Sequence, residues 1–391
     1  MTDFTWPDPL CLDLQLERDD ILIRDAARSF AQDHLRPSVT EDFEEGYTDA
    51  GLFREMGEHG LLGVTMPEKY GGAGASYVAY GLVAREFERI DTGYRSMMNV
   101  QSSLVMYPIC RFGSPEQRGR YLPGLACGKM IGCFALTERG AGSDAASIKT
   151  TATMIHGGYR LDGQKTWISN APIADVFIIW ARSEAHGGSI RGFVVEKGAR
   201  GMSTKRIPNK LAMRTSTNGE IDLDNVVVGK GAMLPTAVGL RAPMDCVSRA
   251  RYEVSWGVMG AAESCYAAAR QSGLDRTKFG RALAGTQLFQ KKLADMATEI
   301  SLGLQASLRV GRLIDGFHHT PAMTSLIKRN NVGKALGIAR KAREMVGGND
   351  MASSYEVMRH MLNLEAVSSY DGTEDVHALI LGREITGHSA F

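Results

Sequence analysis

The periodicity of apolar residues changes twice along the chain, and this change limits the fold more than any other feature of the sequence. In residues 1–130 apolar side chains recur at the three- and four-residue spacing of amphipathic helices. In residues 131–240 short apolar or alternating runs are separated by glycine-rich turns, which is typical of β-strands. Helical spacing returns over long windows in residues 241–391. The sequence therefore predicts three domains in a mainly α-helical protein with a central β domain.

Size and charge narrow the classes of partner. A chain of 391 residues exceeds the length at which one hydrophobic core stops growing, so several packed units are expected. The 45 basic residues are balanced by 44 acidic ones, and no long block of one sign occurs, so we expect no nucleic-acid partner. No run approaches the length of a membrane span, and the cysteines lack zinc-site spacing, so we expect no membrane insertion and no metal. A small-molecule partner is the remaining expectation.

The first residues, MTDFTWPDPL, lack the features of a secretory signal or an Arg-rich transit peptide. We therefore expect a cytoplasmic protein of a bacterium, or a mitochondrial matrix protein only if a presequence has been removed.

Five short segments hold the residues with chemical potential, although each is weak evidence alone. A glycine-rich loop can bring backbone N–H groups close to an anionic or polar ring, whereas glycine pairs after helices usually only end them. The segments are Phe134–Asp144 (FALTERGAGSD), Lys165–Asn170 (KTWISN), Asp275–Gly280 (DRTKFG), Val346–Asn349 (VGGN) and Tyr370–Thr373 (YDGT).

In this order, on a helix, sheet, helix layout, the segments resemble the acyl-CoA dehydrogenase family over nearly the whole chain. The branch that the chain most resembles is glutaryl-CoA dehydrogenase, on the further segments Gly93–Ser96, Gln101–Met106, Ala250–Tyr252 and His377–Arg383. The resemblance implies an N-terminal helical domain, a middle β-barrel and a C-terminal four-helix bundle. It also implies FAD between the β domain and the bundle, a homotetramer built as a dimer of dimers, and an electron-transfer flavoprotein as electron acceptor.

The resemblance assigns the cofactor contacts residue by residue. Those at the flavin ring are Phe134, Leu136 and Thr137, with Trp167, Ile168 and Ser169 covering its far face. Those at phosphates, at adenine or from a neighbouring subunit are Gly142, Ser143, Arg276, Phe279, Gln287, Gly347, Gly348, Thr373 and Asp375. The planar guanidinium of Arg276 can donate parallel hydrogen bonds to a pyrophosphate and carries a fixed positive charge. If FAD needs two chains, a homo-oligomer follows.

The predicted catalytic base is Asp371. Desaturation beside a thioester needs a carboxylate that removes the α-proton while the β-hydrogen leaves as hydride to the flavin. The resembled family has glutamate in a Tyr-Glu-Gly-Thr motif, so Asp371 is one methylene shorter. A misplacement of about 1 Å can cost roughly 100-fold in rate. Asp371 therefore acts after a compensating shift, or the enzyme is specialised for another α-carbon, or the scaffold runs a non-oxidative decarboxylase or lyase reaction. A solvated turn aspartate and a catalytically inactive CoA-binding protein are the remaining alternatives.

The predicted substrate is a glutaryl-CoA-like dicarboxylic thioester, with or without decarboxylation. By resemblance Arg95 binds the distal carboxylate through parallel charge-assisted hydrogen bonds. The other expected substrate contacts are Glu88, Asn99, Ser143, Arg251 and Tyr370. The chain departs from the branch at several positions, including Asn99, Glu253 in place of a glycine, and Asp350 in place of the last glycine of Gly-Gly-Asn-Gly. The acyl group can therefore differ from glutaryl, and its carrier can be CoA or a protein.

Overall fold

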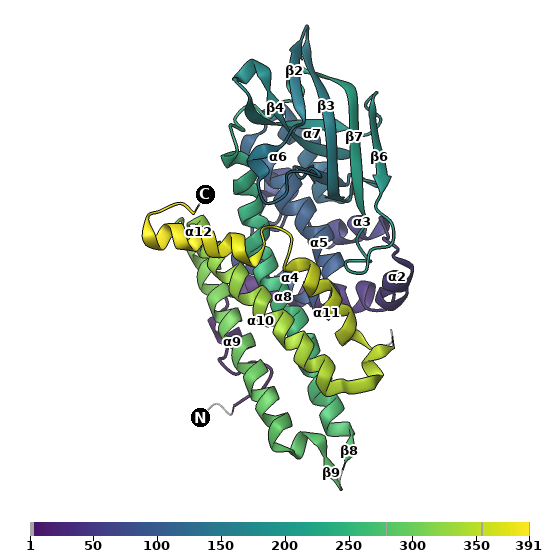
Figure 1. Ribbon diagram of the computed structural model, residues 1–391, viewed down its shortest axis with the longest axis vertical. Helices are drawn as coiled ribbons and strands as arrows, with labels where there is room; N and C mark the ends of the chain where they lie inside the picture. Colours follow the sequence, from purple (N-terminus) through teal and green to yellow (C-terminus); the bar gives the residue numbers. More distant parts are fainter. Residues whose placement is uncertain (1–3, 279, 353–354, 391) are drawn as a thin grey trace.

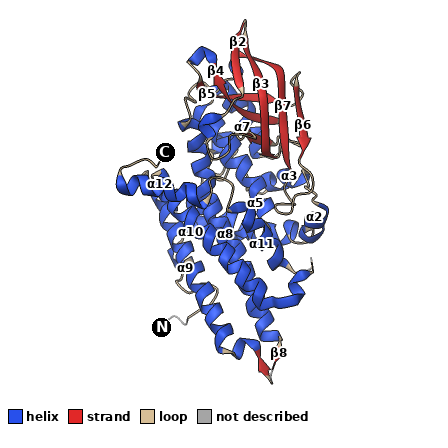
Figure 2. Cartoon of the chain, in the orientation of Figure 1, coloured by secondary structure: helices blue, strands red, loops and turns tan. Residues whose placement is uncertain are grey.

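A β sheet occupies one end of the molecule and a bundle of long helices extends to the other end (Figure 1). The computed structural model describes residues 4–278, 280–352 and 355–390. Helices, then strands, then helices follow one another along the chain, as Figure 2 shows. The order predicted from apolar periodicity is thus confirmed. No helix in the described part of the chain combines the length and apolar character needed to cross a membrane.

The N-terminal region is helical, and several helices begin at a side-chain cap. The helices are α1 (Arg18–Phe30), α2 (Val39–Glu45), α3 (Gly51–Glu58), α4 (Tyr77–Glu88), α5 (Thr92–Asn99), α6 (Tyr107–Phe112) and α7 (Pro115–Ala126), with a π-helical stretch at Val100–Met106. The side chains of Asp91 and Ser114 accept from the backbone N–H groups of Gly93 and Gln117, which satisfies donors that a helix start leaves free. The cap at Asp91 fixes the start of the helix that carries Arg95.

The middle region is one seven-stranded sheet. Its strands are β1 (Gly132–Ala135), β2 (Thr151–Ile155), β3 (Gly158–Ser169), β4 (Val176–Ser183), β5 (Ser189–Glu196), β6 (Met202–Arg206) and β7 (Asn218–Gly229). The order is β1-β4-β2-β3-β7-β6, with β5 pairing with β4. Strand β4 is apolar and almost fully buried because it has neighbours on both sides and cores on both faces. Phe134 of β1 lies opposite Ile178 of β4, which places the loop after β1 at the edge of this core.

The C-terminal region is a helical bundle around one long helix. Its elements are α8 (Arg241–Asp275), the short hairpin β8 (Thr277–Lys278) and β9 (Arg281–Ala282), α9 (Gln287–Asp315), α10 (Pro321–Val346), α11 (Glu356–Val367) and α12 (Glu374–Thr386). Helix α8 crosses α4 at glycines: a Cβ at Gly260 would overlap the carbonyl of Arg85, and one at Gly81 would overlap the Trp256 indole. The close approach needs hydrogen in place of a side chain, and it joins the N-terminal helices to the bundle.

Candidate active site

The turn between α11 and α12 holds Asp371 in an uncommon backbone conformation. Asp371 has φ +52° and Gly372 has φ +91°, both in the left-handed region that costs energy for a residue with a side chain. Thr373 ends the turn, because its hydroxyl accepts from the Val376 N–H at 3.2 Å and caps α12. The strain at Asp371 is therefore imposed by contacts that the turn makes with its neighbours.

Two cations hold this turn. Lys328 of α10 is buried, and its Nζ donates to the carbonyls of Val367 at 3.2 Å, Tyr370 at 3.0 Å and Gly372 at 2.6 Å. Arg251 of α8 donates through Nε to the Asp371 carbonyl at 2.6 Å. Burial lowers the pKa of Lys328 to about 8, although the nearby Asp371 opposes the shift. Lys328 could not be recognised from the sequence, since no motif distinguishes it from the other lysines of a helix.

The Asp371 carboxyl is suited to accept a proton. Burial raises its pKa above the usual aspartate range, while Arg251, Lys328 and Arg95 oppose this and favour the ionised form. A base is most effective when its pKa approaches the working pH. Asp371 is therefore placed and tuned as a candidate general base.

Arg95 lies at the centre of a buried charged cluster. It is 1% exposed, and its Nε donates to Glu88 Oε2 at 2.6 Å while Nη2 donates to the Tyr370 hydroxyl at 2.6 Å. Its Nη1 lies 3.6 Å from Oε2 of Glu253 on α8. Since Tyr370 directly precedes Asp371, the structure brings together the predicted substrate residues Glu88, Arg95 and Tyr370 at the candidate base.

Asn99 and Ser143 take different places. Asn99 lies one helical turn after Arg95 on α5, buried, with Nδ2 3.4 Å from the Ala250 carbonyl. Ser143 is exposed in the loop between β1 and β2. Asn99 therefore lies at the buried end of the candidate site, whereas a substrate contact by Ser143 stays a prediction.

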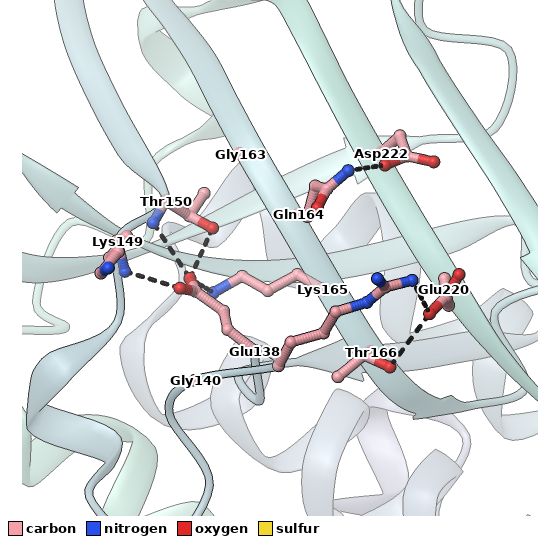
Figure 3. Close-up of a pocket in the computed structure, with 11 residues that line it drawn as sticks. Glu138, Gly140, Lys149, Thr150, Gly163, Gln164, Lys165, Thr166, Glu220 and Asp222 are labelled. Carbon is pink, nitrogen blue, oxygen red and sulfur yellow. Dashed lines mark hydrogen bonds and ion pairs between the residues drawn. The ribbon is translucent and has the colours of Figure 1, made fainter.

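A buried ion pair fixes the loop after β1 against β3 (Figure 3). Lys165 Nζ donates to Glu138 Oε1 at 2.8 Å and to the Leu136 carbonyl at 3.0 Å, and Thr166 N–H donates to the Thr137 carbonyl at 3.0 Å. A cavity of about 310 Å³ lies at these residues between the loop and strands β3 and β7. The pair holds side by side the two segments that the family resemblance assigned to the flavin ring.

Trp167, which follows the residue whose N–H bonds to this loop, presents a flat apolar ring. It is 60% exposed and has φ +58°, an outlier for a bulky residue. Gly142 is exposed, with no atom within 4 Å of the position a Cβ would take. An open, glycine-bearing loop beside an exposed indole fits an aromatic ring system such as isoalloxazine. Phe134, Leu136 and Ile168 are buried, and Ser169 accepts from Asn218 Nδ2 at 2.9 Å, so these residues support the surface from below.

The remaining predicted cofactor residues fall into two separated groups. Arg276 Nη1 donates to the Val346 carbonyl at 2.6 Å, next to Gly347 and Gly348, and Gln287 is exposed at the nearby start of α9. Thr373 and the exposed Asp375 lie instead at the catalytic turn. Helix α10 separates the groups, since Lys328 contacts the turn and Val346 contacts Arg276, and eighteen helical residues span about 27 Å. Phe279 and the side chain of Asp350 lie outside the described residues.

Comparison with known proteins assigns all three regions to one family. Models described as acyl-CoA dehydrogenase N-terminal, middle and C-terminal domains match residues 17–129, 133–226 and 237–386. A crystal structure of glutaryl-CoA dehydrogenase from Mycobacterium smegmatis superposes with a TM-score of 0.96 at 42% identity, covering 98% of this chain and 99% of that one.

Two further relatives agree with this. A second glutaryl-CoA dehydrogenase structure from M. smegmatis, in complex with FADH2, has a TM-score of 0.96 at 39% identity, with coverage of 98% and 99%. An acyl-CoA dehydrogenase of Bacillus subtilis (strain 168) is 31% identical over 377 residues, covering 96% of this chain and all of that protein.

Proposed function

Because the chain belongs to the acyl-CoA dehydrogenase family, an oxidoreductase family that uses FAD, we propose that it desaturates the α,β-bond of a CoA thioester with Asp371 as base. The observation that carries the proposal is the Asp371 carboxyl, whose pKa is raised. The turn that holds it is fixed by the hydrogen bond from Arg251 and lies beside the Arg95 cluster. The bound flavin supplies the acceptor for the hydride.

The residues of the chain divide the remaining work. Asp371 accepts the α-proton, and Arg251 and Lys328 hold the turn and favour its ionised form before the transfer. Trp167 and the loop after β1 present the surface against which the flavin ring packs. The cluster of Glu88, Arg95 and Tyr370 receives the distal end of the acyl chain.

Two observations bear on the acyl group. Arg95 and the likeness to glutaryl-CoA dehydrogenases support a glutaryl-like dicarboxylic chain, with or without loss of carbon dioxide. The carboxylates of Glu88 and Glu253 beside Arg95 disfavour a further anion at the same place. The proposed desaturation holds for either acyl group.

The test is anaerobic flavin reduction by the purified holoenzyme. We expect bleaching of the oxidised flavin spectrum by at least one thioester among butyryl-CoA, glutaryl-CoA and glutaramyl-CoA, whose distal amide replaces the carboxylate. Carbon dioxide release from glutaryl-CoA without bleaching would instead support a non-oxidative decarboxylase. Absence of both reactions in FAD-loaded protein would contradict the proposal.

Replacement of Lys328 by Met should slow flavin reduction about 10- to 100-fold, because the turn that aims Asp371 loses three hydrogen bonds. The rate constant under anaerobic stopped flow measures this, with FAD content as a check on folding. Lys334→Met is the matched control, since Lys334 lies on the same helix but pairs with Glu299 at the surface. Equal rates in both variants would show that Lys328 does not position the base.

We also infer a homo-oligomer. Arg276 and its neighbours Gly347 and Gly348 lie too far along α10 from the Asp371 turn to contact a flavin ring that is bound at that turn in the same chain. A tetramer built as a dimer of dimers, an electron-transfer flavoprotein as acceptor and a cytoplasmic location stay predictions. Light scattering of the holoenzyme tests the first of them, and a monomer that retains FAD would contradict it.

A further inference from the structure

Glu253 is a buried carboxyl without hydrogen bonds. It lies on α8, two residues after Arg251, and is 0% exposed. Neither of its oxygens has a hydrogen-bond partner among the described residues, and its one charged contact is Arg95 Nη1 at 3.6 Å. Leaving a carboxyl buried and unsatisfied costs free energy, and a ligand that donates a hydrogen bond to Glu253 would lower that cost.

The surroundings of Arg95 are already acidic. Nε is engaged by Glu88, Nη2 by Tyr370, and Nη1 faces Glu253, so all three nitrogens already have a neighbour in the chain. Two carboxyls thus share one guanidinium. Helix α8 also lies close to α4 at this point, since a Cβ at Gly257, one turn after Glu253, would overlap Glu88 Oε2. A distal carboxylate of a substrate would be the third acid at one cation.

A second unsatisfied acceptor lies about one helical turn from the first along both helices. The Asn99 side chain follows Arg95 by one turn of α5, and its Oδ1 is buried without a partner. Its Nδ2 faces the Ala250 carbonyl, one turn before Glu253 on α8. The end of the site therefore offers unsatisfied acceptors from two helices, which suit a donor.

We propose that Glu253 occupies the place of a substrate carboxylate beside Arg95, so that the acyl group accepted here carries a hydrogen-bond donor, a hydroxyl or an amide N–H, instead of a free carboxylate. This rests on the proposed function in that the Arg95 cluster receives the acyl tail. Burial, with the carboxylates of Glu88 and Asp371 nearby, raises the pKa of Glu253. A hydrogen-bond donor on the substrate lowers the free-energy cost of burying the Glu253 carboxyl, whereas a substrate carboxylate increases that cost.

Glutaryl-CoA and glutaramyl-CoA test the proposal, because they differ only in a distal carboxylate against an amide. In the wild-type holoenzyme we expect glutaramyl-CoA to bind about 10- to 100-fold more tightly, since a like-charge contact costs on the order of one to three kcal/mol here. Glu253→Gln should reverse or abolish this preference by improving glutaryl-CoA binding. Glu299→Gln, which changes a surface carboxyl, should leave the ratio unchanged.

The dissociation constants are measured by calorimetry in an Asp371→Asn background, so that the comparison does not depend on turnover. Tighter binding of glutaryl-CoA than of glutaramyl-CoA by the protein with Glu253 intact would overturn the proposal, and so would a ratio that Glu253→Gln leaves unchanged. Failure of desaturation is separate, because it appears as absence of flavin bleaching with every thioester while these binding ratios can still be measured.

Discussion

Replacing Asp371 by Asn should lower the rate constant of flavin reduction about 10²- to 10⁴-fold, the range that general-base catalysis contributes. The amide keeps the size of the side chain and removes its ability to accept the α-proton. Because Arg251 and Lys328 bond to backbone carbonyls of the turn, the backbone position should survive the change. Anaerobic stopped-flow spectroscopy of the FAD-loaded variant measures the effect.

Asp371→Glu is the control for this experiment. It keeps the carboxylate and adds one methylene, so we expect flavin reduction well above the rate of Asp371→Asn. Since the pKa of Asp371 is raised, kcat/KM of the wild type should fall with decreasing pH at values above the ordinary aspartate range. A wild-type rate in Asp371→Asn would contradict the assignment of Asp371 as the base.

Replacing Glu263 by Ala should lower the free energy of unfolding by about 3–5 kcal/mol, the usual cost of breaking a buried ion pair from one side. Glu263 of α8 accepts from Arg85 Nε at 2.8 Å and Nη2 at 2.5 Å, and from Arg89 Nη2 at 2.7 Å, with Arg85 and Glu263 both buried. The change would leave Arg85 charged and unpaired where α4 crosses α8. Urea unfolding at fixed protein and FAD concentration measures the loss.

The double variant Arg85→Met with Glu263→Leu separates charge from packing. It removes both buried charges and fills the space with apolar atoms, so we expect it to be much closer in stability to the wild type than Glu263→Ala. Arg89 is partly exposed and can stay hydrated. A double variant as unstable as the single one would show that the geometry of the crossing, and not the unpaired charge, sets the cost.

Periodicity was sufficient to predict the order of helical and β regions, because each of the three regions is dominated by the spacing of one type of element. Alternation in β3 and β7 and the continuous apolar run of β4 mark a sheet with one exposed and one buried part. The helical spacing of α8 to α10 marks a bundle. What periodicity could not provide is the strand order, in which β1 and β2 both flank β4, since that depends on contacts between distant segments.

The site was only partly predictable. Arg95, Tyr370 and Asp371 were found because they belong to recognisable short motifs, and the structure places them together. Lys328 was missed because its role depends on three carbonyls about forty residues away, which no local pattern reports. Glu253 was noticed only as a departure from the branch, since its lack of a partner is a property of the folded interior. Residues that act through long-range burial need coordinates to be recognised.

Helix α8 contributes residues to several different contacts, and its regular geometry fixes the spacing between them. Within thirteen residues it supplies Arg251 to the turn, Glu253 to the Arg95 cluster, Gly257 and Gly260 to the crossing with α4, and Glu263 to the buried ion pair. One inserted or deleted residue would rotate everything beyond it by about 100° and shift it by about 1.5 Å, so all later contacts would fail together. Descendants of this sequence can therefore change acyl preference along α8 by substitution, whereas an insertion before Glu263 would also displace the buried ion pair.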